Sequence, residues 1–282
     1  MTHTRILWTV ILSLLAATAG YAQDDDDSVL KLAEPDFTLI SLPTSLRLPE
    51  HASVFRVTHR FTRPLSCDTC PNSLVGDAFG LDSGARIGLE YRFGIAPNAE
   101  LGVRRTSDKT IELFGQFGLV RQGKGSPLEA SALLALDVSD VGRQQVDSQY
   151  SPALGLILTR LVGDRGAIYV EPIWAHHTNL FATTASTDYT FVLGLGARIR
   201  VRDTVYLVGE LAPRLSGYKP GVSLGGFAIE KRLGGHVFQV NVSDSFATTL
   251  GQIARGGTQT TSADGGSHAD WFLGFNISRK FF

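Results

Sequence analysis

From about residue 52 to its end, the chain consists of short segments in which apolar and polar side chains alternate. In residues 85–93 the odd positions carry Ala, Ile, Leu, Tyr and Phe, whereas the even positions carry Arg, Gly, Glu and Arg. Residues 189–200, 238–242 and 271–277 repeat this period of two. Because successive side chains of a strand point to opposite faces, the pattern predicts strands with one apolar and one polar face.

Alternation alone fits either a soluble two-sheet sandwich or a membrane barrel. No apolar stretch after the N-terminus reaches the length of a membrane helix. Three further features favour the barrel, and the first is charge in the middle of the strands. Membrane barrels turn polar side chains inward and apolar ones toward lipid. We therefore predict that the following residues line the lumen: Arg86, Glu90, Arg92, Glu100, Arg104, Glu112, Glu171, His177, Arg198, Arg200 and Glu210.

Aromatic residues and connection lengths supply the other two features. Aromatic side chains near strand ends are typical of interfacial girdles, and we assign to them Tyr91, Phe93, Tyr169, Trp174, Tyr189, Tyr206, Trp271 and Phe281. Short, turn-like links alternate with longer ones, apart from the short link at 106–108, as expected for periplasmic turns and external loops.

We therefore predict an all-β fold, a transmembrane antiparallel up-and-down β-barrel of about twelve strands in residues 52–282. The strands are expected near residues 52–62, 83–93, 98–105, 109–120, 128–138, 151–162, 166–176, 189–201, 204–212, 221–231, 236–243 and 269–281.

The first 22 residues have the pattern of a secretory signal peptide. Arg5 precedes the apolar run 6–17, and the small residues Gly20 and Ala22 suggest cleavage before Gln23. An uncleaved anchor is the alternative, but the run is shorter than the ~20 residues that a membrane span needs. Export is the consequence.

Residues 23–51 are expected to form a periplasmic leader or a partial plug of the barrel. The segment begins with the acidic run 24–27, to which we assign no site, and contains three prolines. Its later part is too apolar to stay solvated, which favours contact with the barrel.

Four stretches of the mature chain resemble a family of bacterial outer-membrane β-barrels classed as a domain of unknown function. They are Leu-Pro-Thr-Ser-Leu-Arg-Leu-Pro at 42–49, Thr-His-Arg-Phe at 58–61, Phe-Gly-Leu-Asp-Ser-Gly at 79–84 and Ser-Asp-Lys-Thr-Ile-Glu at 107–112. The resemblance implies the outer membrane as the location and transfers no activity. The last strand also resembles the C-terminal signal read by barrel-assembly machinery, although Phe282 follows the apolar register as an extra residue.

The only two cysteines, Cys67 and Cys70, lie in the first long external loop, where a local disulfide is the expected state. Haem attachment would require His at position 71, which is Pro. A metal site would need two more ligands, for which only His51 or His59 could approach.

The pair His176-His177 ends a predicted strand near Glu171. A metal or acid–base pair is one interpretation, but a hydrogen-bonded lumen rim is favoured. Accordingly we predict no metal site and no cofactor.

An outer-membrane hydrolase would need a nucleophile, a His and an orienting group at the outer rim. The chain has no Gly-x-Ser-x-Gly, and no serine stands in a local signature. A loop protease would have only Asp188, Asp264, His268 and Asp270 to use. We therefore predict no catalytic residues and no enzyme.

A channel that is passive or weakly selective for small solutes, or a transport-associated barrel, is the leading functional hypothesis, because the inward charges are of both signs. A closed structural or surface-binding barrel is the alternative, since twelve strands could be nearly filled by side chains. The expected partners are outer-membrane lipid, small solutes and, during biogenesis, barrel-assembly machinery. Nucleic acid is excluded as a partner by the formal net charge of -1.

Overall fold

The computed structural model describes residues 32–67, 70, 72–123, 125–139, 150–178, 188–218, 221–261 and 267–281. The predicted signal peptide and the acidic run 24–27 lie outside the described residues. Among the described residues, no helix has the length and apolarity needed to cross a membrane.

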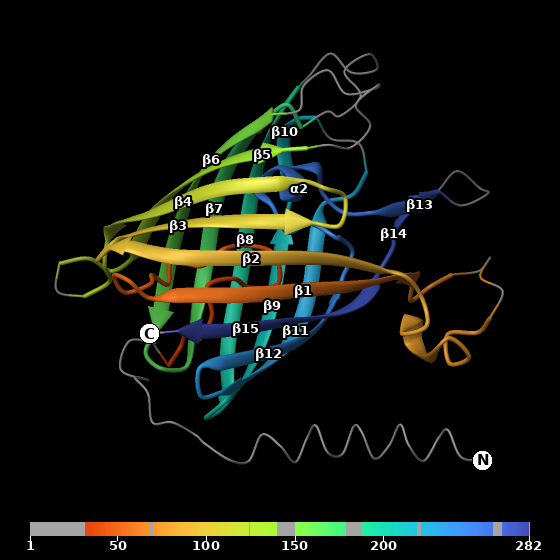
Figure 1. The fold of residues 1–282 in the computed structure, drawn as a ribbon, viewed down its shortest axis with the longest axis horizontal. Coiled ribbons are helices and arrows are strands. Elements are labelled where there is room, and N and C mark those ends of the chain that lie inside the picture. The colour runs from red at the N-terminus through yellow and green to blue at the C-terminus, as the bar shows by residue number, and fades with distance from the viewer. Residues whose placement is uncertain are drawn as a thin grey trace.

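Antiparallel strands form one closed barrel (Figure 1). The barrel strands are β1 (Ser53–Pro64), β2 (Ala85–Ala96), β3 (Ala99–Thr106), β4 (Ile111–Val120), β5 (Glu129–Val138), β6 (Tyr150–Val162), β7 (Gly166–His176), β8 (Tyr189–Arg202), β9 (Val205–Ala212), β11 (Leu224–Leu233), β12 (His236–Ser243) and β15 (Phe272–Phe281). Each strand pairs with its neighbours in the chain, and β1 pairs with β15 to close the barrel. The predicted antiparallel barrel of about twelve strands is confirmed.

Five small elements complete the described chain. β10 (Arg214–Gly217) continues the line of β9 beyond Pro213 and pairs with the same strand, β8. The 3-10 turn η1 (Ala78–Gly80), the helix α2 (Leu250–Arg255) and the hairpin of β13 (Gln259–Thr261) and β14 (Ser267–Ala269) belong to long connections.

The two ends of the barrel differ. Ser53 at the start of β1 is opposite Phe281 at the end of β15, so both chain ends meet the barrel at the same rim. Turns between successive strands lie at this rim, and the long connections lie at the other, together with the short turn between β3 and β4 (Figure 1). We refer to these as the periplasmic and external rims, as in other outer-membrane barrels.

The barrel is inverted relative to a soluble protein, with charge inside and apolar side chains outside. Leu89 is 43% exposed, whereas its neighbours on the other face of β2, Glu90 and Arg92, are 6% and 0% exposed. The same holds around the barrel for the exposed residues Phe55, Leu101, Leu113, Phe117, Leu134, Leu154, Ile168, Leu195, Leu207, Phe227, Ile229, Phe238 and Val240. Such a belt is stable only against lipid.

A proline explains the interruption in the β6–β7 ladder. Pairing stops between Gly155–Ile173 and Leu158–Val170 without a change of register. Pro172 occupies the gap and has no N–H to donate, so the ladder loses its bonds there and resumes beyond it.

Two aromatic assignments were wrong. Tyr169 and Tyr206 are fully buried on the inner face rather than in an interfacial girdle, and the Tyr206 hydroxyl donates to the Leu32 carbonyl (2.9 Å). In contrast, Tyr91, Tyr189 and Phe281 are 42–46% exposed on the outer face.

Candidate functional site

Residues 32–50, which we call the N-terminal plug, lie mostly inside the barrel and reach its rim at the exposed Glu50. Phe37, Leu39, Ile40 and Leu42 are at most 1% exposed, although they belong to no barrel strand. The segment appears in red and orange within the barrel toward the periplasmic rim (Figure 1). The segment folds back on itself. The Leu39 N–H donates to the Leu42 carbonyl (2.7 Å), and the Thr44 N–H donates to the Phe37 carbonyl (2.9 Å).

The tip of the plug is held by one carboxylate. Consecutive backbone N–H groups of Ile40, Ser41 and Leu42 donate to Glu210 of β9 at 2.9–3.0 Å. Three converging amides form an anion-binding concavity, and hydrogen bonds to a charged acceptor are about twice as strong as neutral ones. Glu210 thus fixes the plug to the barrel wall.

Two arginines hold the plug carbonyls. Arg198 makes a two-point ion pair with Glu230 (2.8 and 2.9 Å) and also donates to the carbonyls of Asp36 (3.3 Å) and Thr38 (2.7 Å). Arg56 of β1 donates to the Ile40 carbonyl (2.9 Å) and to the Thr38 hydroxyl. The rigid donor fork of arginine suits several acceptors at once.

The rest of the plug is bound by further side chains. Gln239 donates to the Leu39 carbonyl (2.8 Å), Gln116 donates to Thr44 (2.9 Å), and Glu100 accepts from the Leu48 N–H (3.1 Å). These contacts satisfy plug backbone groups that would otherwise be buried without partners.

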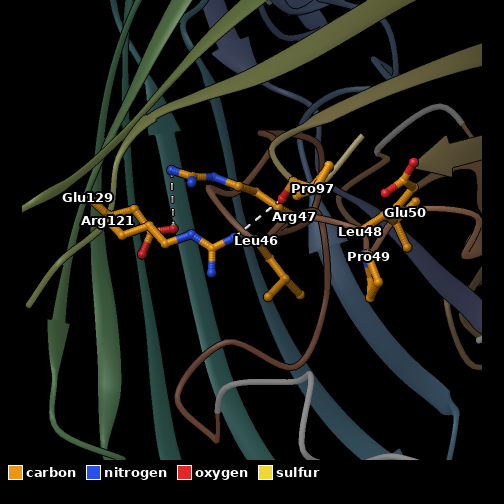
Figure 2. Close-up of a pocket in the computed structure, with 8 residues that line it drawn as sticks. All are labelled: Leu46, Arg47, Leu48, Pro49, Glu50, Pro97, Arg121 and Glu129. Carbon is orange, nitrogen blue, oxygen red and sulfur yellow. Dashed lines mark hydrogen bonds and ion pairs between the residues drawn. The ribbon is translucent and has the colours of Figure 1, made fainter. Parts of the chain in front are cut away.

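Arg47 anchors the plug at the periplasmic rim (Figure 2). Its guanidinium lies 3.6 Å from Glu129 and donates to the carbonyls of Val120 (2.8 Å) and Ala130 (3.1 Å). Arg47 and Arg121 both border a cavity of about 320 Å³, whose lining residues are drawn in Figure 2. Arg121 donates to the Pro97 carbonyl (3.3 Å).

Charged residues of β2, β3 and β4 form a continuous ladder on the inner face. Arg92 lies between Glu90 and Glu100 (2.7 Å to Glu100), and Arg104 lies between Glu90 (2.5 Å) and Glu112. Phe114 packs against both guanidinium groups, 4.9 Å from Arg92 and 4.2 Å from Arg104. Each charge therefore has a partner of opposite sign, as buried charges require.

A second segment covers the lumen from the external rim. Residues 244–258, which we call the external lid, include α2, whose first turn is capped reciprocally by Thr249 and Gln252. The Leu250 N–H donates to Glu112 (2.7 Å), and the Thr249 hydroxyl donates to Asp137 (2.6 Å). The lid is thus bonded to the charged inner wall.

The plug and the lid belong to one apolar cluster. Leu39, Ile40 and Leu42 of the plug cluster with Leu250 and Ile253 of the lid, together with inner-wall residues such as Phe114, Leu133 and Val192. Burying this surface stabilises the closed arrangement by about 25 cal/mol per Å².

Two ionisable groups of the lid, Asp244 and Arg255, have pKa values shifted by burial. Burial raises the pKa of Asp244 to about 6, although its carboxylate accepts from the Gly225 N–H (2.8 Å). Burial also lowers the pKa of Arg255, whose Nε and Nη2 have no hydrogen-bond partner among the described residues. Arg255 lines an external cavity of about 420 Å³ together with Arg86.

Eight of the predicted lumen residues are buried on the inner face, namely Glu90, Arg92, Glu100, Arg104, Glu112, Glu171, Arg198 and Glu210. The other three predicted lumen residues, Arg86, Arg200 and His177, lie near the rims instead of deep in the lumen. Arg86 is exposed at the external cavity, and Arg200 pairs with Asp203 of the periplasmic turn (3.1 Å). His177 follows the end of β7 and lies 3.4 Å from Asp188 at the external rim.

The sequence reasoning missed several inner residues of the same kind. Arg56, Glu230, Gln239 and Asn276 are at most 3% exposed and contact the plug or its partners. The period of two would have found them, since each alternates with apolar neighbours. Cys67 and Cys70 are joined by a disulfide, with Cα atoms 5.5 Å apart.

An inner face of paired charges and an apolar outer belt on a closed antiparallel barrel define the class of outer-membrane β-barrels. The family model described as "Membrane bound beta barrel domain (DUF5777)" matches residues 36–281, and the chain belongs to this family. The predicted family resemblance and the outer-membrane location are confirmed. No curated protein matches the chain.

Two solved structures share the fold. The NanC porin superposes with a TM-score of 0.51 at 6% identity, covering 82% of this chain and all (100%) of that one. The COG4313 outer membrane channel from Pseudomonas putida F1 gives a TM-score of 0.50 at 10% identity, covering 83% of this chain and 97% of that one. At these identities the similarity concerns the barrel architecture alone.

Proposed function

We propose that the protein is an outer-membrane channel for small solutes that is kept closed by its own chain. In this proposal the N-terminal plug and the external lid must both move before a solute passes. The observation that carries it is the binding of three consecutive plug amides by Glu210, deep in the lumen. A passive pore would instead expose these lumen carboxylates and guanidinium groups to water.

Cavity sizes support a closed resting state. Cavities of about 320 and 420 Å³ lie at the periplasmic and external rims. Between them, the cavity beside Ile40, Arg56 and Thr248 measures about 10 Å³, which is roughly the space of one water molecule. A solute entering from outside would first meet Arg86 and the donors of Arg255 that have no hydrogen-bond partner in the described part of the chain.

The plug is attached to the barrel wall by noncovalent contacts, which supports its role as a movable gate. The contacts between plug and wall are mainly hydrogen bonds to backbone groups, which water can replace one by one once the segment moves. A permanently closed structural or surface-binding barrel is the second candidate. The apolar cluster shared by plug and lid favours it, because opening must expose that cluster.

Planar-bilayer conductance of protein refolded from residue 23 onward tests the proposal. The first variant, the plug deletion, lacks residues 32–50. The second, the double variant, lacks the same residues and also carries a Gly-Ser linker in place of Leu250–Arg255. Deletion of residues 24–27 is the matched control. We expect the full chain and the control to be silent, the plug deletion to open in brief steps, and the double variant to conduct steadily.

Continuous conductance by the full chain would contradict closure by the plug. Silence of the double variant, with its heat-modifiable gel mobility showing that it is folded, would favour the permanently closed barrel.

A further inference from the structure

The end of β7 and the start of β8 bring three metal-ligating side chains together at the external rim. His176 ends β7, His177 follows it, and Asp188 directly precedes β8. One ligand atom from each lies within 4.8 Å of the others. We propose that these residues bind a divalent transition-metal ion of the zinc type.

The backbone holds the two sides of this site in place. The Thr178 N–H donates to the Asp188 carbonyl (3.2 Å), and the hydroxyls of Thr178 and Thr190 are 2.8 Å apart in a buried contact. These bonds extend the β7–β8 pairing past the strand ends. The separation of His177 from Asp188 is therefore set by the hairpin base and not by two free side chains.

The hydrogen bond of His177 directs one ring nitrogen to the site. Its Nδ1 lies 2.7 Å from the Tyr150 carbonyl, which can only accept, so Nδ1 carries the hydrogen. In the neutral ring, Nε2 then has a free lone pair, and it faces Asp188 Oδ2 at 3.4 Å. Two acceptors at this distance repel each other unless a proton or a cation lies between them. Zinc-ligating histidines characteristically donate their other nitrogen to a carbonyl or carboxylate.

The spacing between two of the three ligand atoms matches a tetrahedral ion, and the third atom lies within 4.8 Å of both. Zinc binds imidazole nitrogen and carboxylate oxygen at about 2.0–2.2 Å, which places tetrahedral ligands about 3.3–3.5 Å apart. The measured 3.4 Å between His177 Nε2 and Asp188 Oδ2 falls in this range.

Ligand chemistry selects the class of ion. Two imidazoles and one carboxylate suit zinc and its neighbours in the transition series, whereas calcium and magnesium prefer sites made of oxygen. All three side chains are partly exposed, so an ion can arrive from the external side and a water can fill the fourth position. Bound zinc would cross-link the two ends of the connection between β7 and β8.

Calorimetric titration with zinc chloride of the refolded chain from residue 23 onward, at neutral pH in metal-free detergent buffer, tests this inference. We expect one saturable site per chain that calcium does not fill. His176→Ala, His177→Ala and Asp188→Asn should each weaken binding at least about tenfold, the range seen when metal sites lose a supporting group.

His51→Ala is the matched control, because His51 also neighbours a carboxylate, Glu50 (4.0 Å), but lies at the periplasmic rim. It should bind zinc as the full chain does. The acidic run 24–27 is present in every variant, so it cannot produce a difference between them. A chain that binds no zinc, or whose binding survives all three rim substitutions, would overturn the inference. Neither result depends on the channel being open.

Discussion

Glu210 binds three consecutive backbone amides of the plug. A glutamine at position 210 keeps one acceptor oxygen but loses the charge that attracts three amides. We expect Glu210→Gln to weaken plug binding by about 1–3 kcal/mol, which raises the displaced fraction by about five- to 150-fold.

Single-channel opening frequency, recorded in chains whose lid helix is a Gly-Ser linker, measures this effect directly. Asp203→Asn is the control, because this carboxylate lies in a periplasmic turn and contacts Arg200 rather than the plug. Equal opening frequencies in the two variants would show that Glu210 does not retain the plug.

Asp244 makes the external lid sensitive to pH. Its folded-state pKa of about 6 exceeds the ordinary value of 3.8, so the protonated form favours the closed lid. This stabilisation is complete below about pH 4 and is lost as the pH rises through 6. Glu210 opposes ionisation of Asp244, and Arg214 favours it, but burial dominates both.

Amide exchange of residues 250–255, corrected for intrinsic rates, should therefore speed up between pH 4 and pH 7. Asp244→Asn keeps an acceptor for the Gly225 N–H and removes the titration. The variant should lose the pH dependence, and an unchanged profile would assign it to another group.

At the scale of the elements, the β3–β4 pair depends on a glycine. A Cβ at Gly102 would lie 2.1 Å from the Phe114 ring, which fills the space between Arg92 and Arg104. We expect Gly102→Ala to destabilise the barrel by about 1–3 kcal/mol, the usual effect of overpacking.

Gly209→Ala is the matched control, since its Cβ would meet nothing nearer than 3.8 Å. Urea midpoints of the refolded variants give the comparison. A shift as large in Gly209→Ala as in Gly102→Ala would point to a general loss of glycine rather than to crowding of Phe114.

The strands were predictable from the sequence because each must satisfy a period of two. Their bounds agree with the expected ones within three residues, and β11, for example, begins at Leu224 rather than near 221. Val222 there bridges to Gly257 of the lid instead of joining the ladder. Inner charges such as Glu90 and Arg198 followed from the same alternation.

The plug and the lid were harder to predict, because neither has a regular period. Plug backbone groups bind side chains that are distant in sequence, such as Glu210 and Arg198, and no local pattern encodes such a partner. The lid helix is six residues long, which is too short for a periodic signal. The apolar composition of Phe37–Leu42 predicted contact with the barrel but not the individual residues that bind the segment.

For the whole molecule, one arrangement connects these scales. The apolar belt faces lipid, inner charges of β2, β3, β4, β8 and β11 form ion pairs, and the lumen is filled by chain segments from both rims. Without its charged partners, the plug would bury backbone N–H and C=O groups that have no hydrogen bond, which costs free energy because these groups are far from bulk water. The proposed closure thus depends on the complete chain rather than on the strands alone.

Hydrogen–deuterium exchange of the protein reconstituted in lipid bilayers at neutral pH tests the position of the plug most directly. The amides of Ile40, Ser41 and Leu42 bond to Glu210 inside the barrel, so peptides covering residues 36–46 should be protected about as strongly as peptides from β5. Complete exchange of residues 36–46 within seconds, with β5 still protected, would contradict a lumen occupied by the N-terminal plug.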